Sequence, residues 1–287
     1  MKTMMRSLLI PGLLCLSGGV AAEQDYYGPD YPGVSFIQKI FGEDRLYFRA
    51  GAMYQVPDVV TKSITLKNLS EIAEVAVEPG PQEGEAFSDP LLLPAVRLGY
   101  KLRWTLWGGG WSIETVAGLP PTLELKAKGK LADVPLVTEA NGIPTEVPAL
   151  GEKVAETKVA PPLFTLVKQF NRDSRLRPYV GLGWVYLFSY DSHVTNPVLL
   201  EVGEPELDIE DKFGWVGQVG LDYRISDYWW ISADYKYISV TDVTATLEKA
   251  YIKPKGLPQY DYAEVGDTEF VADLNTHAFH LGIGFTF

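Results

Sequence analysis

The sequence predicts an all-β protein, an eight-stranded antiparallel transmembrane β-barrel with short periplasmic turns and long extracellular loops. Three observations support this fold class. Apolar and polar residues alternate with a period of two in eight segments, and an export signal precedes them. The connections between these segments are alternately short and long. This combination is typical of outer-membrane barrels.

Residues 1–22 have the pattern of a secretory signal peptide. Lys2 and Arg6 come before or at the start of an apolar run, and small residues lead to an expected cleavage point after Ala22. The run, residues 8–16, is shorter than the roughly 20 residues that a membrane-spanning helix needs. The single cysteine, Cys15, lies in this segment, so we expect a mature protein without a disulfide or a lipid anchor.

The charge of the chain excludes one large class of partner. The formal net charge is −12, and loss of the two basic residues of the signal peptide changes it to −14. Nucleic-acid binding depends on Lys and Arg contacts to phosphate, so an acidic chain binds it poorly. We therefore expect no nucleic-acid partner.

Eight segments show the alternation of half-buried strands. In the clearest of them, residues 176–188, aliphatic and aromatic side chains share one face, and glycine, arginine and tyrosine share the other. The predicted strands are residues 46–54, 92–104, 111–119, 160–170, 176–188, 212–225, 229–237 and 276–287.

The composition of the two faces distinguishes a membrane barrel from a soluble sandwich. A sandwich turns its bulky residues inward, whereas a membrane barrel turns them toward lipid and keeps polar residues inside. The lumen of eight strands has room only for side chains or one small ligand. The charges inside either pair into a plugged interior or leave it open. The predicted lumen-facing residues are Arg49, Arg97, Lys101, Arg103, Glu114, Val116, Gln218, Asp222, Arg224, Asp234, Lys236 and His280.

The connections orient the barrel in the membrane. Residues 105–110, 171–175 and 226–228 are short turns, which are expected on the periplasmic side. The long, acidic loops expected outside the cell are residues 56–91, 120–158, 189–211 and 246–273. An even number of strands then places both chain ends in the periplasm.

Aromatic residues gather at both ends of the predicted strands, as in the interfacial girdles of membrane proteins. Strands of any kind are also rich in aromatic residues, which is the alternative explanation. The predicted periplasmic girdle is Trp104, Trp107, Trp111, Phe170, Trp229, Trp230 and Phe287. The predicted extracellular girdle is Tyr54, Tyr186, Phe188, Phe213 and Tyr237.

The last eight residues, HLGIGFTF, form a well-patterned strand that runs to the end of the chain. A barrel must close, because an open strand edge would leave backbone groups unpaired in hydrocarbon. The last strand should therefore pair with the first and be well formed.

Several segments together resemble the OmpW family of small outer-membrane barrels. They are ETVAGLPPTLELKAKGKL (residues 114–131), KVAPP (158–162), RPYVGLGW (177–184), GWVGQVGLDYRISDYWW (214–230) and the terminal HLGIGFTF. The resemblance implies an eight-stranded barrel with a narrow, largely apolar channel for small hydrophobic molecules. It also implies a place in the outer membrane among lipid and lipopolysaccharide, and Phe287 as the assembly signal read by the barrel-insertion machinery.

The resemblance leaves a second function open. Members of the family also serve as surface receptors for phage and toxins, so a structural or receptor barrel without transport is the alternative. The chain departs from the family in its longer, more acidic loops and in a long segment before the first strand. The barrel is residues 45–287, and this periplasmic N-terminal segment is residues 23–44. Phe36, Ile37, Ile40 and Phe41 there have helical spacing, which predicts a short amphipathic helix on the membrane face or in the barrel mouth.

Proline pairs mark a candidate lateral opening between the third and fourth predicted strands. Proline donates no hydrogen bond to a strand ladder, so these pairs either weaken the pairing near the outer leaflet or only terminate the strands. We expect an apolar solute to leave sideways there, beside Val116, Leu119, Pro120, Pro121, Val159, Pro161, Pro162 and Leu163.

Nothing in the sequence predicts catalysis, a cofactor or a metal site. A nucleophile needs an adjacent base, and the chain has three histidines, His193, His277 and His280. His193 follows Asp191 and Ser192 directly, but triads are built in space rather than along the chain. The acidic stretch at residues 201–212 lacks the pattern of a calcium loop.

Overall fold

The structure is a computed structural model that describes residues 45–69, 80–104, 106–118, 120–133, 139–140, 143–144, 146–256 and 261–286. The predictions for the signal peptide, for residues 23–44, for Leu119 and for Phe287 lie outside the described residues.

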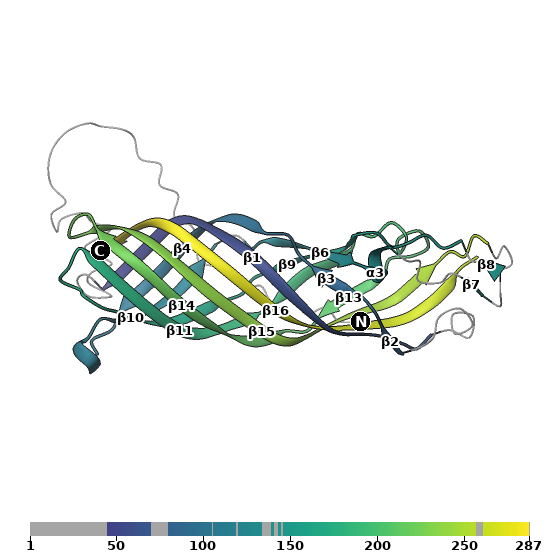
Figure 1. Cartoon of the computed structure of the whole chain (residues 1–287), viewed down its shortest axis with the longest axis horizontal. Helices are drawn as coiled ribbons and strands as arrows, with labels where there is room; N and C mark the ends of the chain where they lie inside the picture. The colour runs from purple at the N-terminus through teal and green to yellow at the C-terminus, as the bar shows by residue number, and fades with distance from the viewer. Residues whose placement is uncertain are drawn as a thin grey trace, which may run out of the picture.

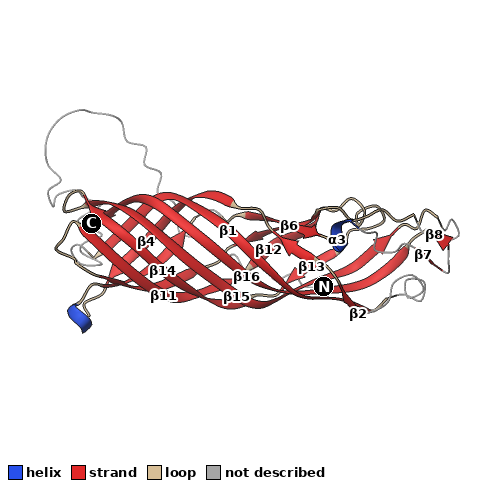
Figure 2. Cartoon of the chain, in the orientation of Figure 1, coloured by secondary structure: helices blue, strands red, loops and turns tan. Residues whose placement is uncertain are grey.

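Strands dominate the described chain (Figures 1 and 2). The helices are the 3-10 turn η1 (Leu106–Gly108) and the short α3 (Lys130–Asp133). No described helix is long and apolar enough to cross a membrane. The strands are β1 (Leu46–Lys67), β2 (Gly80–Gln82), β3 (Glu85–Phe87), β4 (Leu91–Lys101), β5 (Trp111–Ala117), β6 (Thr122–Lys128), β7 (Glu139–Ala140), β8 (Ile143–Pro144), β9 (Lys153–Val159), β10 (Leu163–Gln169), β11 (Leu176–Leu187), β12 (Ser189–Val194), β13 (Glu206–Ile209), β14 (Lys212–Arg224), β15 (Trp229–Ile252) and β16 (Ala263–Thr286).

Eight antiparallel strands close into a ring in the order β1-β4-β5-β10-β11-β14-β15-β16. The ring is closed by β16, which pairs with both β1 and β15. The last strand is regular up to Thr286, which pairs with Tyr47. Closure satisfies the backbone groups of both end strands, which hydrocarbon could not hydrogen-bond. The predicted fold class is confirmed.

The alternation of side chains follows the pattern expected of a membrane barrel. Large apolar residues point outward, with Leu182 at 66% and Phe213 at 69% exposure. Charged residues of the barrel strands point inward, with Arg97 of β4 at 1% and Glu114 of β5 at 2% exposure. Successive side chains of a strand point to opposite faces of the sheet. The apolar residues of each barrel strand therefore face outward, and the charged residues between them face the lumen.

The long connections contain much more regular structure than loops would have. β1, β15 and β16 continue past the barrel, so large parts of residues 56–91 and 246–273 are strand. A second sheet, β12-β9-β6-β3, faces these extensions at the end of the molecule opposite the C-terminus (Figure 1). Because backbone pairing continues past the barrel, the connections expected to be extracellular loops form a sheet-walled extension of the barrel.

One girdle assignment is wrong. Trp229 and Phe170 are exposed at the short-turn end, as predicted, but Trp230 is buried inside the barrel. Trp230 shares the inward face of β15 with Ser232 and Asp234, because residues two apart on a strand point the same way. Its ring packs edge-on against Tyr47 at a centroid distance of 6.0 Å.

Candidate functional site

A layer of six buried charges crosses the middle of the barrel. We call this layer the charged plug. Three cations, Arg49, Arg97 and Lys236, share it with three carboxylates, Glu114, Asp222 and Asp234, and all six side chains are buried. Their formal charges cancel. Burial of an unpaired charge costs several kcal/mol, so balance is a condition for such a layer to exist.

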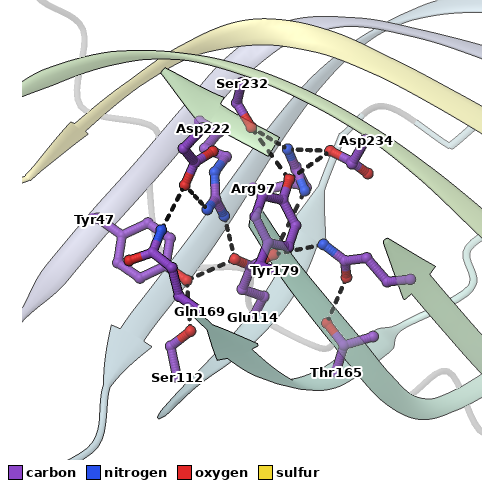
Figure 3. Close-up of polar contacts among 12 residues, drawn as sticks. Tyr47, Arg97, Ser112, Glu114, Thr165, Gln169, Tyr179, Asp222, Ser232 and Asp234 are labelled. Atoms are coloured by element: carbon purple, nitrogen blue, oxygen red, sulfur yellow. Dashed lines mark hydrogen bonds and ion pairs between the residues drawn. The ribbon is translucent and has the colours of Figure 1, made fainter. Parts of the chain in front are cut away.

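Ion pairs connect the plug across the lumen (Figure 3). Arg49 contacts Glu114 and places Nη2 2.8 Å from Asp222 Oδ2. Arg97 Nη2 lies 2.5 Å from Asp234 Oδ2, and Lys236 Nζ lies 2.9 Å from Asp234 Oδ1. The Arg49–Asp222 and Arg97–Asp234 pairs join strands on different sides of the ring and bridge the channel, whereas Lys236 and Asp234 both lie on β15.

Neutral polar groups donate hydrogen bonds to Glu114 and Asp234 of the plug, whereas Asp222 Oδ1 has no hydrogen-bond partner among the described residues. Tyr47 donates its hydroxyl to Glu114 Oε1 at 2.6 Å, and Gln218 Nε2 donates to Glu114 Oε2 at 3.2 Å. Tyr179 donates to Asp234 Oδ2 at 3.2 Å (Figure 3). Buried ionic groups are tolerated when pairing and hydrogen bonds are both present. An apolar solute would have to break this network to pass along the axis.

The lumen above the plug is apolar. A buried aliphatic cluster, which we call the aliphatic layer, follows the plug toward the extracellular side, and Val116, Leu123, Ile209, Ile238 and Leu274 pack against it. Its members are Val159, Leu163, Val185, Leu187, Val216, Val240 and Val243. The barrel interior thus changes from ionic to aliphatic along its axis.

A cavity of about 460 Å³ lies in the extracellular extension, between the continuations of β1, β15 and β16 and the second sheet. We call it the extracellular pocket. Leu66, Leu199, Ala245, Leu247 and Val265 supply much of its wall, with Lys126 and Lys130 among its polar residues. A mostly apolar pocket of this size is typical of a site for a small molecule.

Backbone pairing between β5 and β10 is interrupted beside the aliphatic layer. The register ends at Thr115 opposite Phe164. It resumes where Val159 N donates to Pro121 O at 3.2 Å and where β6 pairs with β9. Both proline pairs lie in the interval. On the other side of β5, pairing with β4 ends at Ala117.

The residues predicted beside this interruption fall partly inside the wall. Val159 and Leu163 are buried members of the aliphatic layer, and Val116 packs against it. The prolines are at the surface or partly buried. Leu119 is outside the described residues. We call the interruption the β5–β10 seam.

Other predicted lumen residues are spread along the barrel. His280 joins the plug, with Nδ1 3.0 Å from Arg97 Nη2. Lys101 donates to Thr286 Oγ1 at 3.0 Å and Arg224 to the carbonyl of Asp173 at 3.3 Å, both near the short turns. Arg103 is exposed and lies beyond the end of β4, so its assignment to the lumen is wrong. The alternation stops where the strand stops.

The predicted lumen-facing residues do not include two tyrosines and a tryptophan that point into the lumen, although the alternation had already set Tyr179 on the same face as Arg177. Tyr47, Tyr179 and Trp230 are buried and lie above glycines of adjacent strands, Gly99, Gly220 and Gly284. The available signal was their position on the inward face together with those glycines. It was outweighed by the expectation that aromatic rings face lipid.

The run of Asp191, Ser192 and His193 forms no triad. Ser192 Oγ hydrogen-bonds Thr157 Oγ1 at 2.7 Å, and Asp191 pairs with Lys158 at 2.6 Å. The hydrogen bond from Lys158 lowers the pKa of Asp191. The described residues also hold no group of three or more His, Cys, Asp or Glu side chains placed to bind a metal.

Comparison with known proteins establishes the family. The OmpW family model matches residues 43–287. This chain belongs to the OmpW family. It is 34% identical to outer membrane protein W of Vibrio cholerae over 35% of this chain and 46% of that protein. It is 32% identical to outer membrane protein AlkL of Ectopseudomonas oleovorans over 40% of this chain and 50% of that protein. The chain spans about half the length of these curated relatives.

Solved structures of OmpW-like barrels share the fold. OprG from Pseudomonas aeruginosa aligns with a TM-score of 0.61 and 19% identity over 85% of this chain and 96% of that one. AlkL in lipid bilayers aligns with a TM-score of 0.50 and 15% identity over 95% and 97%. As an OmpW-family barrel, the protein lies in the outer membrane, surrounded by lipid and lipopolysaccharide, and it is not an enzyme.

Proposed function

We propose that this OmpW-family barrel passes small hydrophobic molecules from outside the cell into the outer membrane by a lateral route. The observation that carries the proposal is the order of features along the axis. An apolar pocket lies outside, an aliphatic layer follows, and the charged plug blocks the axis below it. A solute that arrives from outside meets apolar surface until it reaches the plug.

The extracellular pocket sets the class of solute. Transfer of apolar surface out of water contributes about 0.8 kcal/mol per buried CH₂ group. Leu66, Leu199 and Leu247 supply such surface, and the solute gives up no hydrogen bonds to contact them. The pocket therefore favours neutral or weakly polar hydrocarbons over sugars and ions.

The β5–β10 seam is the exit that costs least. Below it the solute would have to separate Arg97 from Asp234 and Arg49 from Asp222. At the seam no backbone ladder has to be broken, and Val116 and Leu163 offer an apolar path to the lipid. Release into the bilayer keeps the solute out of water throughout.

A disulfide across the seam tests the route. Continuing the register of Thr115 and Phe164 would set Val116 opposite Leu163. We expect Val116→Cys/Leu163→Cys to lower the uptake rate of radiolabelled n-dodecane by cells to that of cells without the protein under oxidising conditions. Dithiothreitol should restore the rate, because reduction frees the seam. The single native cysteine lies in the expected signal peptide.

The matched control places the same two cysteines in a seam that is already paired. Leu166 and Leu182 are register partners on β10 and β11. Leu166→Cys/Leu182→Cys should leave uptake unchanged in both redox states. Equal uptake with and without the wild-type protein would remove the transport function and favour the receptor or structural barrel. If the Val116–Leu163 disulfide leaves the uptake rate unchanged, the lateral route is disproved but the transport function is not.

A further inference from the structure

A second cavity, of about 890 Å³, lies on the other side of the charged plug. The strand ends and the short turns form its wall, so it is located at the periplasmic end of the barrel. We call it the periplasmic vestibule. Arg49 and Asp222, which pair with each other in the plug, also line it. The proposed transport of apolar solutes makes no use of this cavity.

The vestibule is cationic although the chain is acidic. The whole chain has a formal net charge of −12. Apart from the Arg49–Asp222 pair, the described residues that line the cavity include six basic side chains and two carboxylates, Asp173 and Asp227. The six are Arg45, Lys101, Lys168, Arg172, Arg177 and Arg224, and they come from different parts of the ring. Cavity walls of low dielectric strengthen the field of such a charge excess.

Neutral oxygens accept the hydrogen bonds of several of these cations. Arg177 Nε donates to Ser174 O at 3.1 Å, and Arg224 Nη2 donates to Asp173 O at 3.3 Å. Lys168, which is 8% exposed, donates to the carbonyl oxygens of Trp107, at 2.8 Å, and Gly109. Carbonyl oxygens satisfy N–H groups but, being neutral, do not cancel the positive charge. Buried or half-buried cations of this kind favour a bound anion.

Two buried N–H groups point to the same need. Arg49 Nε and Trp230 Nε1 have no hydrogen-bond partner within the described part of the chain. Both side chains are more than nine-tenths buried, and both line the vestibule. A buried donor without an acceptor costs about 1–3 kcal/mol. An oxyanion in the vestibule would supply acceptors to donors of this kind.

We propose that the periplasmic vestibule is a binding site for a small molecule that carries two or more phosphate or carboxylate groups. Guanidinium groups bind such groups through paired N–H···O bonds, and Arg172, Arg177 and Arg224 provide three of them near the mouth. The volume suits a ligand of metabolite size. The ligand would enter this site from the periplasm, and the charged plug separates the site from the apolar route.

Calorimetric titration of the full chain in a zwitterionic detergent tests this site. Inorganic pyrophosphate and citrate serve as probes, so that phosphate and carboxylate chemistry are measured separately. We expect saturable binding of at least one probe at low ionic strength. Affinity should fall steeply as salt is added, because salt screens the cations at the open mouth.

Arg172→Gln/Arg177→Gln should weaken that binding by about tenfold or more, which corresponds to 1.4 kcal/mol or more. The control, Lys67→Gln/Lys249→Gln, removes two positive charges that pair with Glu269 and Glu206 outside the vestibule. It should bind the probes like the wild type. A heat-dependent shift in gel migration would verify that each variant forms a barrel.

The same chemistry could come from the headgroups of anionic phospholipids at the rim. Repeating the titration in nanodiscs with phosphatidylglycerol distinguishes the two sources. Unchanged probe affinity there supports a soluble ligand, and loss of affinity shows that lipid headgroups occupy the site. No saturable binding of either probe by the folded wild type in detergent would overturn the proposal. Equal weakening in the Lys67/Lys249 control would do so as well.

Discussion

The absence of a Cβ atom at certain glycines allows large aromatic rings to fit inside this barrel. A Cβ atom added to Gly284 would lie 2.1 Å from the indole ring of Trp230, and one added to Gly99 would lie 2.1 Å from the Tyr47 ring. Such separations are far shorter than a van der Waals contact. Glycine on one strand therefore creates the space that a large ring on the next strand fills, and the hydroxyl of Tyr47 reaches Glu114 of the charged plug.

We expect Gly284→Ala to destabilise the barrel by about 1–3 kcal/mol, the usual cost of overpacking. The methyl group would displace Trp230, whose ring also packs edge-on against Tyr47. Urea unfolding in phosphocholine vesicles would measure the loss. Gly217→Ala is the control, because its added methyl group meets the Trp215 ring at an ordinary 3.4 Å. Equal stability of both variants would show that the rings adapt freely.

At the scale of elements, the length of three strands creates the site. β1, β15 and β16 continue beyond the ring and carry Leu66, Leu247 and Val265 into the wall of the extracellular pocket. Register shifts occur in β1 between Thr61 and Ser63 and in β15 between Val240 and Val243. Bulges bend strands and increase their twist. These register shifts lie where β1 and β15 leave the barrel wall and enter the wall of the extracellular pocket.

Filling the pocket from one of these strands should block capture. We expect Ala245→Phe to reduce the n-dodecane uptake rate by about tenfold, since a lost apolar contact area worth 1.4 kcal/mol changes an equilibrium tenfold. Ala245 lines the pocket, whereas Glu248 on the same strand is exposed and does not. Glu248→Phe adds the same ring outside and should leave the rate unchanged. Normal uptake by Ala245→Phe would show that the solute takes another path.

At the scale of the whole molecule, four compartments follow one another along the axis. They are the extracellular pocket, the aliphatic layer, the charged plug and the periplasmic vestibule. The order separates apolar chemistry from anion chemistry by a layer of zero net charge. Apart from Arg49 and Asp222, which belong to both the plug and the vestibule wall, the residues of one compartment can be altered without changing those of the next.

Replacement of residues 122–158 by Asn-Gly should separate folding from function. Pro121 and Val159 are joined by a backbone hydrogen bond, so a two-residue turn can connect them. The eight-stranded ring loses none of its pairing partners, and we expect the variant to show the heat-dependent gel shift of a folded barrel. Uptake of n-dodecane should fall to the background rate, because β6 and β9 form part of the pocket wall.

A variant that no longer folds would show that the extension is part of the folding unit. A folded variant with normal uptake would show that the pocket is dispensable for transport. Pyrophosphate binding in the vestibule should survive in the folded variant, since none of the deleted residues lines that cavity.

Much of this architecture could be predicted from the period-two pattern. The outward positions of Leu182 and Phe213 and the inward positions of Arg97, Glu114 and Asp234 follow from alternation alone. The same pattern shows how the predictions for Trp230 and Arg103 went wrong. Trp230 belongs to the inward face by its position, but its size suggested the girdle, and Arg103 continues the pattern past the end of β4. Residue type misled at the first position, and strand length at the second.

The fold class and the faces on which charges lie could be predicted from the sequence, because alternation is a local property of neighbouring residues. The orientation of the strands was predicted from the lengths of the connections, which are also visible in the sequence. Tertiary structure alone decided which charges pair, where the β5–β10 ladder is interrupted and how the connections build a pocket. Those features depend on residues far apart in the chain, such as Arg49 and Asp222, whose distance is set by the closure of the ring. The vestibule has the same origin, since its cations meet only when the ends of the strands are brought together in a circle.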